Sequence, residues 1–259
     1  MLDSPILLFR EAIVSIDNFQ YIESSYILPD ELGYDDSPFR DPVRFYLGRP
    51  IAGLGFTHRP VSIGYRASWI DGSGRMVRGV VTAAHHLPDD SRGRMMVIDH
   101  NGWRFAGRTG PSDIRVDATF VGINDSSEFR NHIDMGVWMP GGRRFVQGTS
   151  YGQIIQGGQV HTLGRHSGVN TGRVVNLAHT ETTEMRGREI RLTLVGVSFD
   201  LALIPGDSGS IVFSRITTNP QIQTYGPIGI IHGRSRYVHT RGYFVRASTI
   251  NALLGIRLY

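Results

Sequence analysis

One short stretch of the sequence places a serine where it could act as a nucleophile. Residues 204–212 read IPGDSGSIV, so Ser208 follows Asp207 and lies between Gly206 and Gly209. A serine nucleophile needs a tight turn whose backbone N–H groups face a developing oxyanion, and Gly206 and Ser208 could supply those two donors. Gly206 has no Cβ to block a substrate carbonyl, and Gly209 allows an unusual φ after the turn. The same residue types also form ordinary polar β-turns, so the motif needs partners elsewhere in the chain.

Two further residues could complete the chemistry of this serine. Acyl transfer by serine requires a base that takes the hydroxyl proton and a buried carboxylate that orients this base. His85 ends the apolar run Gly79–Ala84, which predicts an imidazole at the edge of a sheet, and Asp134 opens the run Asp134–Trp138. A histidine at a strand end and an aspartate before a strand are each common structural residues. Their order along the chain, followed by the serine, favours a catalytic set.

The elements that must position these residues are short β-strands. From Val61 onward, short apolar runs alternate with glycine-containing turns, a pattern typical of an antiparallel barrel or sandwich. A first hairpin is predicted by the runs Val61–Ile70 and Met76–Ala83 on either side of Asp71–Gly74. The remaining strands are predicted at Met95–Asp99, Trp103–Ala106, Ile114–Ile123, Met135–Met139, Val160–Leu163, Arg173–Ala178, Ile190–Phe199, Ser210–Phe213, Pro227–Ile231 and Tyr243–Arg246. Only Ser248–Leu254 is expected to be helical in this part of the chain.

The first 49 residues differ from the rest of the chain. Ser4 and Pro5 could cap and begin a helix that runs through Ile16. The segment Leu28–Pro50 is rich in proline and aspartate, as expected of an irregular arm or a linker. We therefore expect a partly helical N-terminal extension over residues 1–49, a pro-segment or a regulatory arm, followed by one domain over residues 50–259.

Composition bounds the class of protein. The chain has 259 residues, 32 glycines and 19% charged residues, which predicts a folded and loop-rich protein. No window approaches the roughly 18 consecutive apolar residues of a membrane helix, and Asp3 stands where a secretion signal carries positive charge. The absence of cysteine excludes disulfides and favours a reducing, cytoplasmic compartment. Secretion stays open if the chain is a processed form.

Neither nucleic acid nor a cofactor is indicated as a ligand. All 27 basic residues are arginine, and the net charge of +4 is spread along the chain without forming a basic arm. The ten histidines include no HExxH motif, and the adjacent His85 and His86 would point to opposite faces of a strand. A phosphate-binding glycine loop with its lysine is also missing. We therefore expect no metal and no cofactor.

The motifs together resemble the chymotrypsin-like serine proteases, in particular the bacterial branch with alpha-lytic protease and the Streptomyces griseus proteases. The resemblance covers about Ile51–Tyr259. It implies an all-β fold of two six-stranded antiparallel barrels with a short C-terminal helix. It is carried by Ser62–Tyr65, Thr82–His85, Asp134–Val137 and Pro205–Ser210, and more weakly by Gly168–Gly172 and Tyr243–Leu258.

The resemblance also implies an activity and residue roles. The chain would be a serine endopeptidase that hydrolyses peptide bonds through an acyl-enzyme. Ser208 would be the nucleophile, His85 the general base and acid, and Asp134 the partner that orients His85. The N–H groups of Gly206 and Ser208 would form the oxyanion hole. The expected partner is a protein or peptide substrate, together with a possible regulatory partner that acts through the N-terminal extension.

Asp207 then requires a positive partner. A carboxylate buried under the nucleophile turn would be costly if it were unpaired. Arg165 is the candidate, because the bacterial branch uses an internal arginine here. A freed N-terminus near Ile51 is the alternative.

Substrate preference follows from positions where the chain departs from the family. Ala202 stands at the expected base of the S1 pocket, where no acid is present to receive lysine or arginine. His232 stands where the family usually has serine, and Arg234 where it usually has glycine. A small or apolar P1 residue is expected, with an acidic one as the alternative. The implied pocket residues are Ala202, Gly168, Thr171, Gly172, His232, Gly233 and Arg234.

Two alternatives remain at this stage. His232 could hydrogen-bond Asp134, contact the substrate or be a satisfied core histidine. The chain could also be a catalytically silent, protease-like module that binds a protein partner. Such modules usually lack a member of the catalytic set, whereas this chain has candidates for all three.

Overall fold

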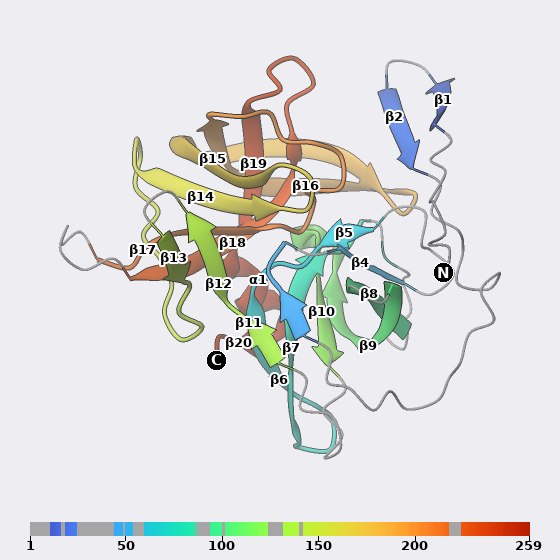
Figure 1. Cartoon of the computed structure of the whole chain (residues 1–259), viewed down its shortest axis with the longest axis vertical. Coiled ribbons are helices and arrows are strands. Elements are labelled where there is room, and N and C mark those ends of the chain that lie inside the picture. The colour runs from blue at the N-terminus through green and yellow to red at the C-terminus, as the bar shows by residue number, and fades with distance from the viewer. Residues whose placement is uncertain are drawn as a thin grey trace, which may run out of the picture.

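The computed structural model describes most of the chain, which is built almost entirely from β-strands (Figure 1). Within the described residues, the strands form two large sheets and three two-stranded pairs, and a single α-helix lies near the C-terminus. The described residues are 11–16, 19–24, 44–48, 50–53, 60–85, 87, 94–99, 102–123, 132–139, 142–217 and 224–259.

The first large sheet has eight strands and is built mainly from the N-terminal half of the chain. Each strand pairs antiparallel with its neighbours. In spatial order the strands are β20 (Ile256–Arg257), β6 (Arg66–Ile70), β7 (Met76–Ala83), β10 (Ala118–Ile123), β9 (Gly102–Asp113), β8 (Arg94–Asp99), β4 (Pro50–Gly53) and β5 (Val61–Ser62). The edge strand β20 comes from the end of the chain, so the C-terminus completes the N-terminal sheet.

The second large sheet closes into a barrel of six antiparallel strands, which confirms the barrel predicted for the C-terminal half. Figure 1 shows it as a separate body beside the first sheet. Its strands in spatial order are β14 (Gln159–Gly164), β15 (Gly168–Met185), β16 (Arg188–Phe199), β19 (Arg241–Arg246), β18 (Tyr225–Arg234) and β17 (Ile211–Arg215).

The N-terminal extension contains strands instead of the predicted helix over its described residues. β1 (Glu11–Ile16) pairs antiparallel with β2 (Phe19–Ser24). The predicted helix is therefore wrong over residues 11–16, where three of the six residues are β-branched and favour a strand. Residues 1–10 of that prediction lie outside the described residues.

The remaining elements are short. β3 (Arg44–Tyr46) pairs parallel with β11 (His132–Asp134), and β12 (Gly136–Met139) pairs antiparallel with β13 (Gly142–Phe145). The helix α1 (Ala247–Leu254) matches the predicted C-terminal helix and is ended by Gly255 at a φ of 63°. A positive φ suits glycine at this position.

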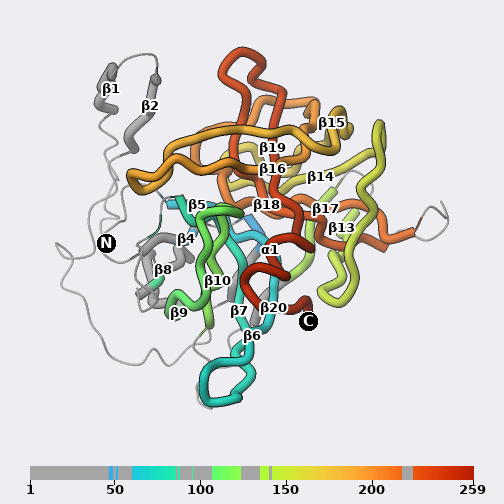
Figure 2. Tube along the Cα trace, turned by 180° about the vertical axis from the view of Figure 1, so that it is seen from behind, coloured from blue at the N-terminus to red at the C-terminus, as the bar shows by residue number. Residues whose placement is uncertain are grey.

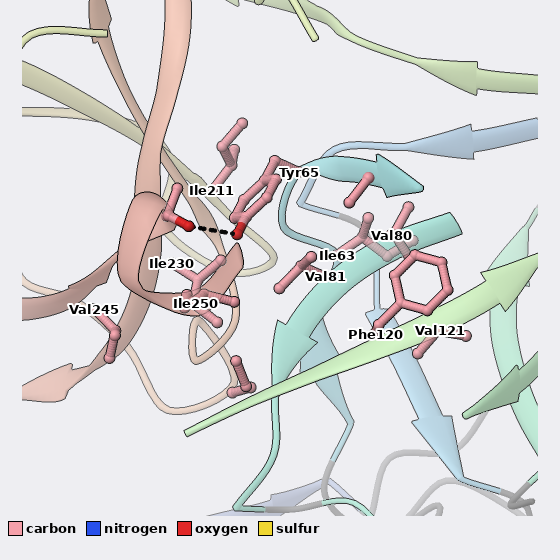
Figure 3. Packing of buried hydrophobic residues seen from close by; sticks show 14 of the residues in the cluster. Ile63, Tyr65, Val80, Val81, Phe120, Val121, Ile211, Ile230, Val245 and Ile250 are labelled. Carbon is pink, nitrogen blue, oxygen red and sulfur yellow. Dashed lines mark hydrogen bonds between the residues drawn. The ribbon is translucent and has the colours of Figure 1, made fainter. Parts of the chain in front are cut away.

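A shared core joins the two large sheets. Tyr65, just before β6, is fully buried in one cluster with Ile211 of β17 and Ile230 of β18 (Figure 3). Its hydroxyl donates to Asn251 Oδ1 in α1 at 2.8 Å and lies 3.5 Å from the carbonyl oxygen of Ala247. A buried tyrosine is usually hydrogen-bonded through its hydroxyl in this way. The side chain of Tyr65 therefore joins the segment before β6 to strands of the barrel and to α1.

A long hairpin from the barrel also reaches the N-terminal sheet. β15 and β16 turn at Arg186 and Gly187, whose φ angles are 53° and 69°. Leu192 and Leu194 of β16 lie in the same core cluster as Val116, which precedes β10. Figure 2 shows this hairpin extending from the barrel above the turn that precedes β10. The segment before β10 is thus covered by the C-terminal barrel.

One predicted strand is interrupted at a position that matters for the site. Residues Ile114–Val116 form a 3₁₀ turn, η2, and only Ala118–Ile123 continue as β10. Asp117 lies between them in the left-handed conformation, with φ 43° and ψ 46°. Aspartate tolerates this conformation better than most residues with a Cβ. Asp117 consequently does not follow the pattern in which successive side chains of a strand point to opposite faces of the sheet.

Candidate active site

Asp117 holds both the backbone and the side chain of His85. Oδ1 of Asp117 accepts the backbone N–H of Ala84 at 3.1 Å and of His85 at 2.9 Å. Oδ2 lies 2.7 Å from Nδ1 of His85. His85 stands in the turn after β7, so this one carboxylate fixes the position of the turn and the orientation of the imidazole.

The carboxyl group of Asp117 is ionised. Its side chain is fully buried, which by itself would raise its pKa, but the charge interactions and hydrogen bonds with His85 and His232 outweigh burial and hold the pKa well below its ordinary range. An ionised carboxylate only accepts hydrogen bonds, so the Nδ1 atoms facing it must carry protons. Nε2 is then the basic nitrogen of a neutral His85.

His232 is a second imidazole on the same carboxylate. Its Nδ1 lies 2.6 Å from Oδ2 of Asp117, and its ring centroid lies 5.8 Å from that of His85 at an interplanar angle of 81°. Burial lowers the pKa of His232, whereas the hydrogen bond to Asp117 and the charges of Asp117 and Glu181 raise it, and the net direction is upward. The hydrogen-bonding role that the sequence left open for His232 is therefore filled by Asp117.

The carboxylate in contact with Nδ1 of His85 is not the one that the sequence suggested. Asp134 ends β11, and its side chain lies outside the described residues. Asp117 was overlooked because Ile114–Ile123 reads as one apolar strand. A local signal was present in Asp113, whose side chain accepts the N–H of Arg115 at 2.8 Å, a turn typical of aspartate two residues before its partner.

Ser208 lies on a tight turn directly before β17. Both glycines of the turn have positive φ values, 96° at Gly206 and 83° at Gly209, and the sequence led us to expect this at Gly209. A Cβ at Gly209 would lie 2.5 Å from Thr82 Oγ1, so this close approach to β7 requires glycine. Ser208 Oγ donates to the carbonyl oxygen of His232 at 3.3 Å, and the serine is partly buried. This long hydrogen bond is weak.

Two N–H groups of the turn donate no hydrogen bond to the described part of the chain. The N–H groups of Asp207 and Ser210 donate to the carbonyls of Ile204 and Asp207, each at 3.0 Å, and that of Gly209 donates to Ile231 at 2.8 Å. Among the hydrogen bonds of the described residues, none has the N–H of Gly206 or Ser208 as its donor. These are the two donors that the sequence assigns to an oxyanion hole.

Asp207 is stabilised by backbone N–H groups. Oδ1 accepts those of His166 at 3.0 Å and Ser167 at 3.3 Å, and Oδ2 accepts that of Ile204 at 2.9 Å. Three such donors can satisfy a buried carboxylate without a cation. Gly164 makes room for this, since a Cβ there would lie 2.4 Å from Oδ1.

The ion pair between Asp207 and Arg165 stays a prediction. The ion pairs found between described side chains do not join Asp207 to Arg165. The backbone N–H of Arg165 instead donates to Ser62 Oγ at 3.1 Å. The alternative partner, an N-terminus near Ile51, does not apply in this structure, because Ile51 is buried within β4 and pairs with Val97.

The residues predicted to line the pocket lie on three segments that side-chain hydrogen bonds connect. Gly168, Thr171 and Gly172 lie on β15, His232, Gly233 and Arg234 end β18, and Ala202 lies in the loop after β16. Nη1 of Arg234 donates to the carbonyl of Leu203 at 2.8 Å, which ties the end of β18 to this loop. Asn170 of β15 exchanges hydrogen bonds of 2.8 and 3.1 Å with Leu201, which ties β15 to the same loop.

The cluster of His85, Asp117 and His232 is better suited to protons than to a metal ion. One ligand atom from each residue lies within 4.8 Å of the others. Both Nδ1 atoms, however, are at hydrogen-bond distance from Oδ2, at 2.7 and 2.6 Å, and a metal would require both to lose their protons. Both Nδ1 atoms are therefore paired with Oδ2 of Asp117 through protons in this arrangement.

No helix among the described residues is long and apolar enough to cross a membrane, since α1 has only eight residues.

Solved structures of bacterial proteases are similar to this chain over most of its length. The chymotrypsin of Cellulomonas bogoriensis is 20% identical, with a TM-score of 0.58, over 83% of this chain and 98% of that chain. Nocardiopsis protease (NAPase) is 21% identical, with a TM-score of 0.59, over 83% and 99%. A glutamic acid specific serine protease, described as using a novel histidine triad in substrate binding, is 17% identical, with a TM-score of 0.58, over 83% and 100%.

No protein-family model and no curated protein sequence matches the chain. The structural matches show that the chain has the chymotrypsin-like fold, as the sequence predicted.

Proposed function

We propose that the chain is a serine endopeptidase in which Ser208 is the nucleophile, His85 the general base and acid, and Asp117 the orienting carboxylate. The observation that carries this proposal is the 2.7 Å contact between His85 Nδ1 and Asp117 Oδ2, at the junction that also holds the Ser208 turn. Asp117 takes the role that the sequence gave to Asp134. The two unoccupied N–H groups of the turn, at Gly206 and Ser208, form the proposed oxyanion hole.

The proposed reaction has two steps. Nε2 of His85 takes the proton of Ser208 Oγ as this oxygen attacks the substrate carbonyl, and the N–H groups of Gly206 and Ser208 stabilise the resulting oxyanion. His85 then gives its proton to the leaving amine, which departs and leaves an acyl-enzyme. Water, deprotonated by His85, attacks the acyl group, and the returned proton restores Ser208. Asp117 stays ionised throughout and stabilises the imidazolium.

The weak bond between Ser208 Oγ and the His232 carbonyl fits a resting state of this site. At 3.3 Å it restrains the hydroxyl little, so a change of the serine rotamer can bring Oγ to the imidazole when a substrate binds.

The proposed substrate is a protein or peptide with a small or apolar P1 residue. Ala202 offers no charge to a basic side chain. An acidic P1 residue is the second candidate, because Nη1 of Arg234 is used by the Leu203 carbonyl while an arginine has five N–H donors. Profiling of cleavage sites with a peptide library, on the wild type and Arg234→Gly, separates the two: loss of an acidic preference in the variant supports the second candidate.

The competing function is a silent, protease-like binding module. A fluorophosphonate probe distinguishes the two, because it reacts only with an activated serine. Labelling at Ser208 that disappears in Ser208→Ala and drops strongly in Asp117→Asn supports the endopeptidase. A folded wild-type chain that is not labelled at Ser208 and does not cleave the peptide library would overturn the proposal.

Residues 1–49 are proposed as an N-terminal extension that acts as a pro-segment or a regulatory arm. β3 and Leu47, which lie before the expected boundary, already pair and pack with the domain, so any such function belongs to residues before Arg44. Mass spectrometry of the purified full chain over time tests the pro-segment: self-cleavage before Arg44 in the wild type and not in Ser208→Ala is expected. The absence of cysteine keeps a cytoplasmic location as the proposed one.

A further inference from the structure

Ser62 of the N-terminal sheet contacts the nucleophile turn on both sides of Asp207. It lies at the end of β5 and is fully buried. Its hydroxyl donates to the carbonyl oxygen of Gly206 at 2.9 Å, and its backbone N–H donates to the carbonyl oxygen of Ser208 at 2.8 Å. A single residue outside the turn therefore holds two of the turn's carbonyls.

The first of these hydrogen bonds sets the direction of a peptide plane. The carbonyl of Gly206 and the N–H of Asp207 belong to the same planar unit. Ser62 holds the carbonyl end, and the Ile204 carbonyl holds the N–H end at 3.0 Å. With both ends fixed, this plane cannot rotate, and the unoccupied N–H groups of Gly206 and Ser208 flank it.

The turn needs such support because Gly206 restrains its own backbone conformation little. Glycine at a φ of 96° passes easily to other backbone conformations, so its own torsions do not hold the N–H in one direction. Catalysis by an oxyanion hole depends on donors that are oriented before the charge develops. The orientation must therefore come from contacts, and the contact on the Gly206 carbonyl is the Ser62 hydroxyl.

The same hydroxyl connects the turn to the loop that stabilises Asp207. Ser62 Oγ accepts the N–H of Arg165 at 3.1 Å while it donates to Gly206. The next two residues, His166 and Ser167, donate their N–H groups to Asp207 Oδ1. One buried hydroxyl thus joins β5, the loop after β14 and the nucleophile turn, using both its donor and an acceptor position.

We propose that Ser62 is a positioning residue that holds the oxyanion hole in its active geometry. The inference rests on the proposed endopeptidase function and adds a residue of the N-terminal sheet to it. Loss of an oxyanion-hole donor lowers kcat by about 10²- to 10³-fold, and a donor that is misdirected rather than removed should lower it by about 10- to 100-fold.

The test is Ser62→Ala in the full chain, with Ser214→Ala as the matched control. Ser214 is also buried, and its hydroxyl also donates to a backbone carbonyl, that of Gln153 at 2.6 Å, but it lies on β17 away from the turn. The readouts are kcat, KM and the inhibition constant of a peptide boronate, whose tetrahedral adduct with Ser208 places an oxygen in the oxyanion hole. The peptide sequence is that of the best substrate from library profiling.

Ser62→Ala is expected to lower kcat about 10- to 100-fold and to raise the inhibition constant of the boronate by a similar factor. KM should change less than about threefold. Ser214→Ala should change none of the three by more than about threefold. A purely structural role of Ser62 would instead lower the melting temperature of Ser62→Ala and leave the kcat of its folded form unchanged.

If Ser62→Ala does not fold, Ser62→Cys replaces it, because the thiol is close in shape and a weak donor. A folded variant that keeps both kcat and the boronate constant within about threefold of wild type overturns the role of Ser62 alone. A wild-type chain that neither cleaves the peptide nor binds the boronate overturns the proposed function, and the inference with it.

Discussion

The second histidine on Asp117 should move the pH dependence of the reaction. When His232 carries a proton, a second proton on His85 is opposed by a charge whose ring centroid is 5.8 Å away. At an effective dielectric constant of about 20, the repulsion between two unit charges at this distance is about 3 kcal/mol. The hydrogen bond to Asp117 and the charges of Asp117 and Glu181 raise the pKa of His232, so His232 carries this charge to higher pH than a free imidazole would.

His232→Ser removes this charge and leaves Asp117 to His85. The acid limb of kcat/KM should then move to higher pH, by about 1 unit once partial protonation and the shared carboxylate reduce the full repulsion. The titratable groups that face His232 are Asp117, His85 and Glu181. All three are retained in His232→Ser. The measurement is kcat/KM against pH from 4.5 to 9 with one peptide substrate.

The control for this experiment is His179→Ser. His179 stacks on Tyr243 with ring centroids 4.4 Å apart and makes none of the hydrogen bonds found for Asp117. The acid limb of this variant should coincide with that of the wild type. An acid limb of His232→Ser that stays within 0.3 units of wild type, or moves to lower pH, would refute the reasoning about the shared carboxylate.

Three further outcomes are expected. Asp117→Asn should lower kcat by about 10⁴-fold, because the amide favours the wrong tautomer of the histidine, whereas Asp134→Asn should stay within about threefold; equal losses would contradict the assignment. Arg186→Asn removes two 3.0 Å hydrogen bonds to the carbonyl oxygens of Ala84 and Leu87, on either side of His85. Asparagine tolerates the positive φ of this position, so kcat should fall about tenfold while the melting temperature stays unchanged. The control Arg188→Asn, at an exposed position, should change neither quantity. Burial and a nearby arginine lower the pKa of His161 to about 4, so the unfolded chain takes up a proton below pH 6.5 that the folded chain refuses. Urea denaturation should show a loss of about 2 kcal/mol between pH 7 and pH 5 that is absent in His161→Phe, and an identical loss in both would exclude this histidine.

The nucleophile turn could be predicted from sequence because its determinants are local. Gly206 and Gly209 have positive φ values and Ser208 lies between them, which follows from residue types that adjoin one another. The six strands of the barrel were located for the same reason, since alternation of apolar residues and glycine turns is visible within each segment. The N-terminal helix was the exception, because cap residues outweighed the β-branched residues of Glu11–Ile16 in the prediction.

The partners of the predicted residues were decided by tertiary structure. Ala118 of β10 stands opposite Ala83 of β7, and this register places Asp117 beside Ala84 and His85, more than thirty positions earlier. This register cannot be predicted from the sequence of either strand alone, because it is set by the packing of the whole sheet. The sequence by itself determined that a serine turn and a histidine were present, whereas only the folded chain decided which carboxylate meets the histidine.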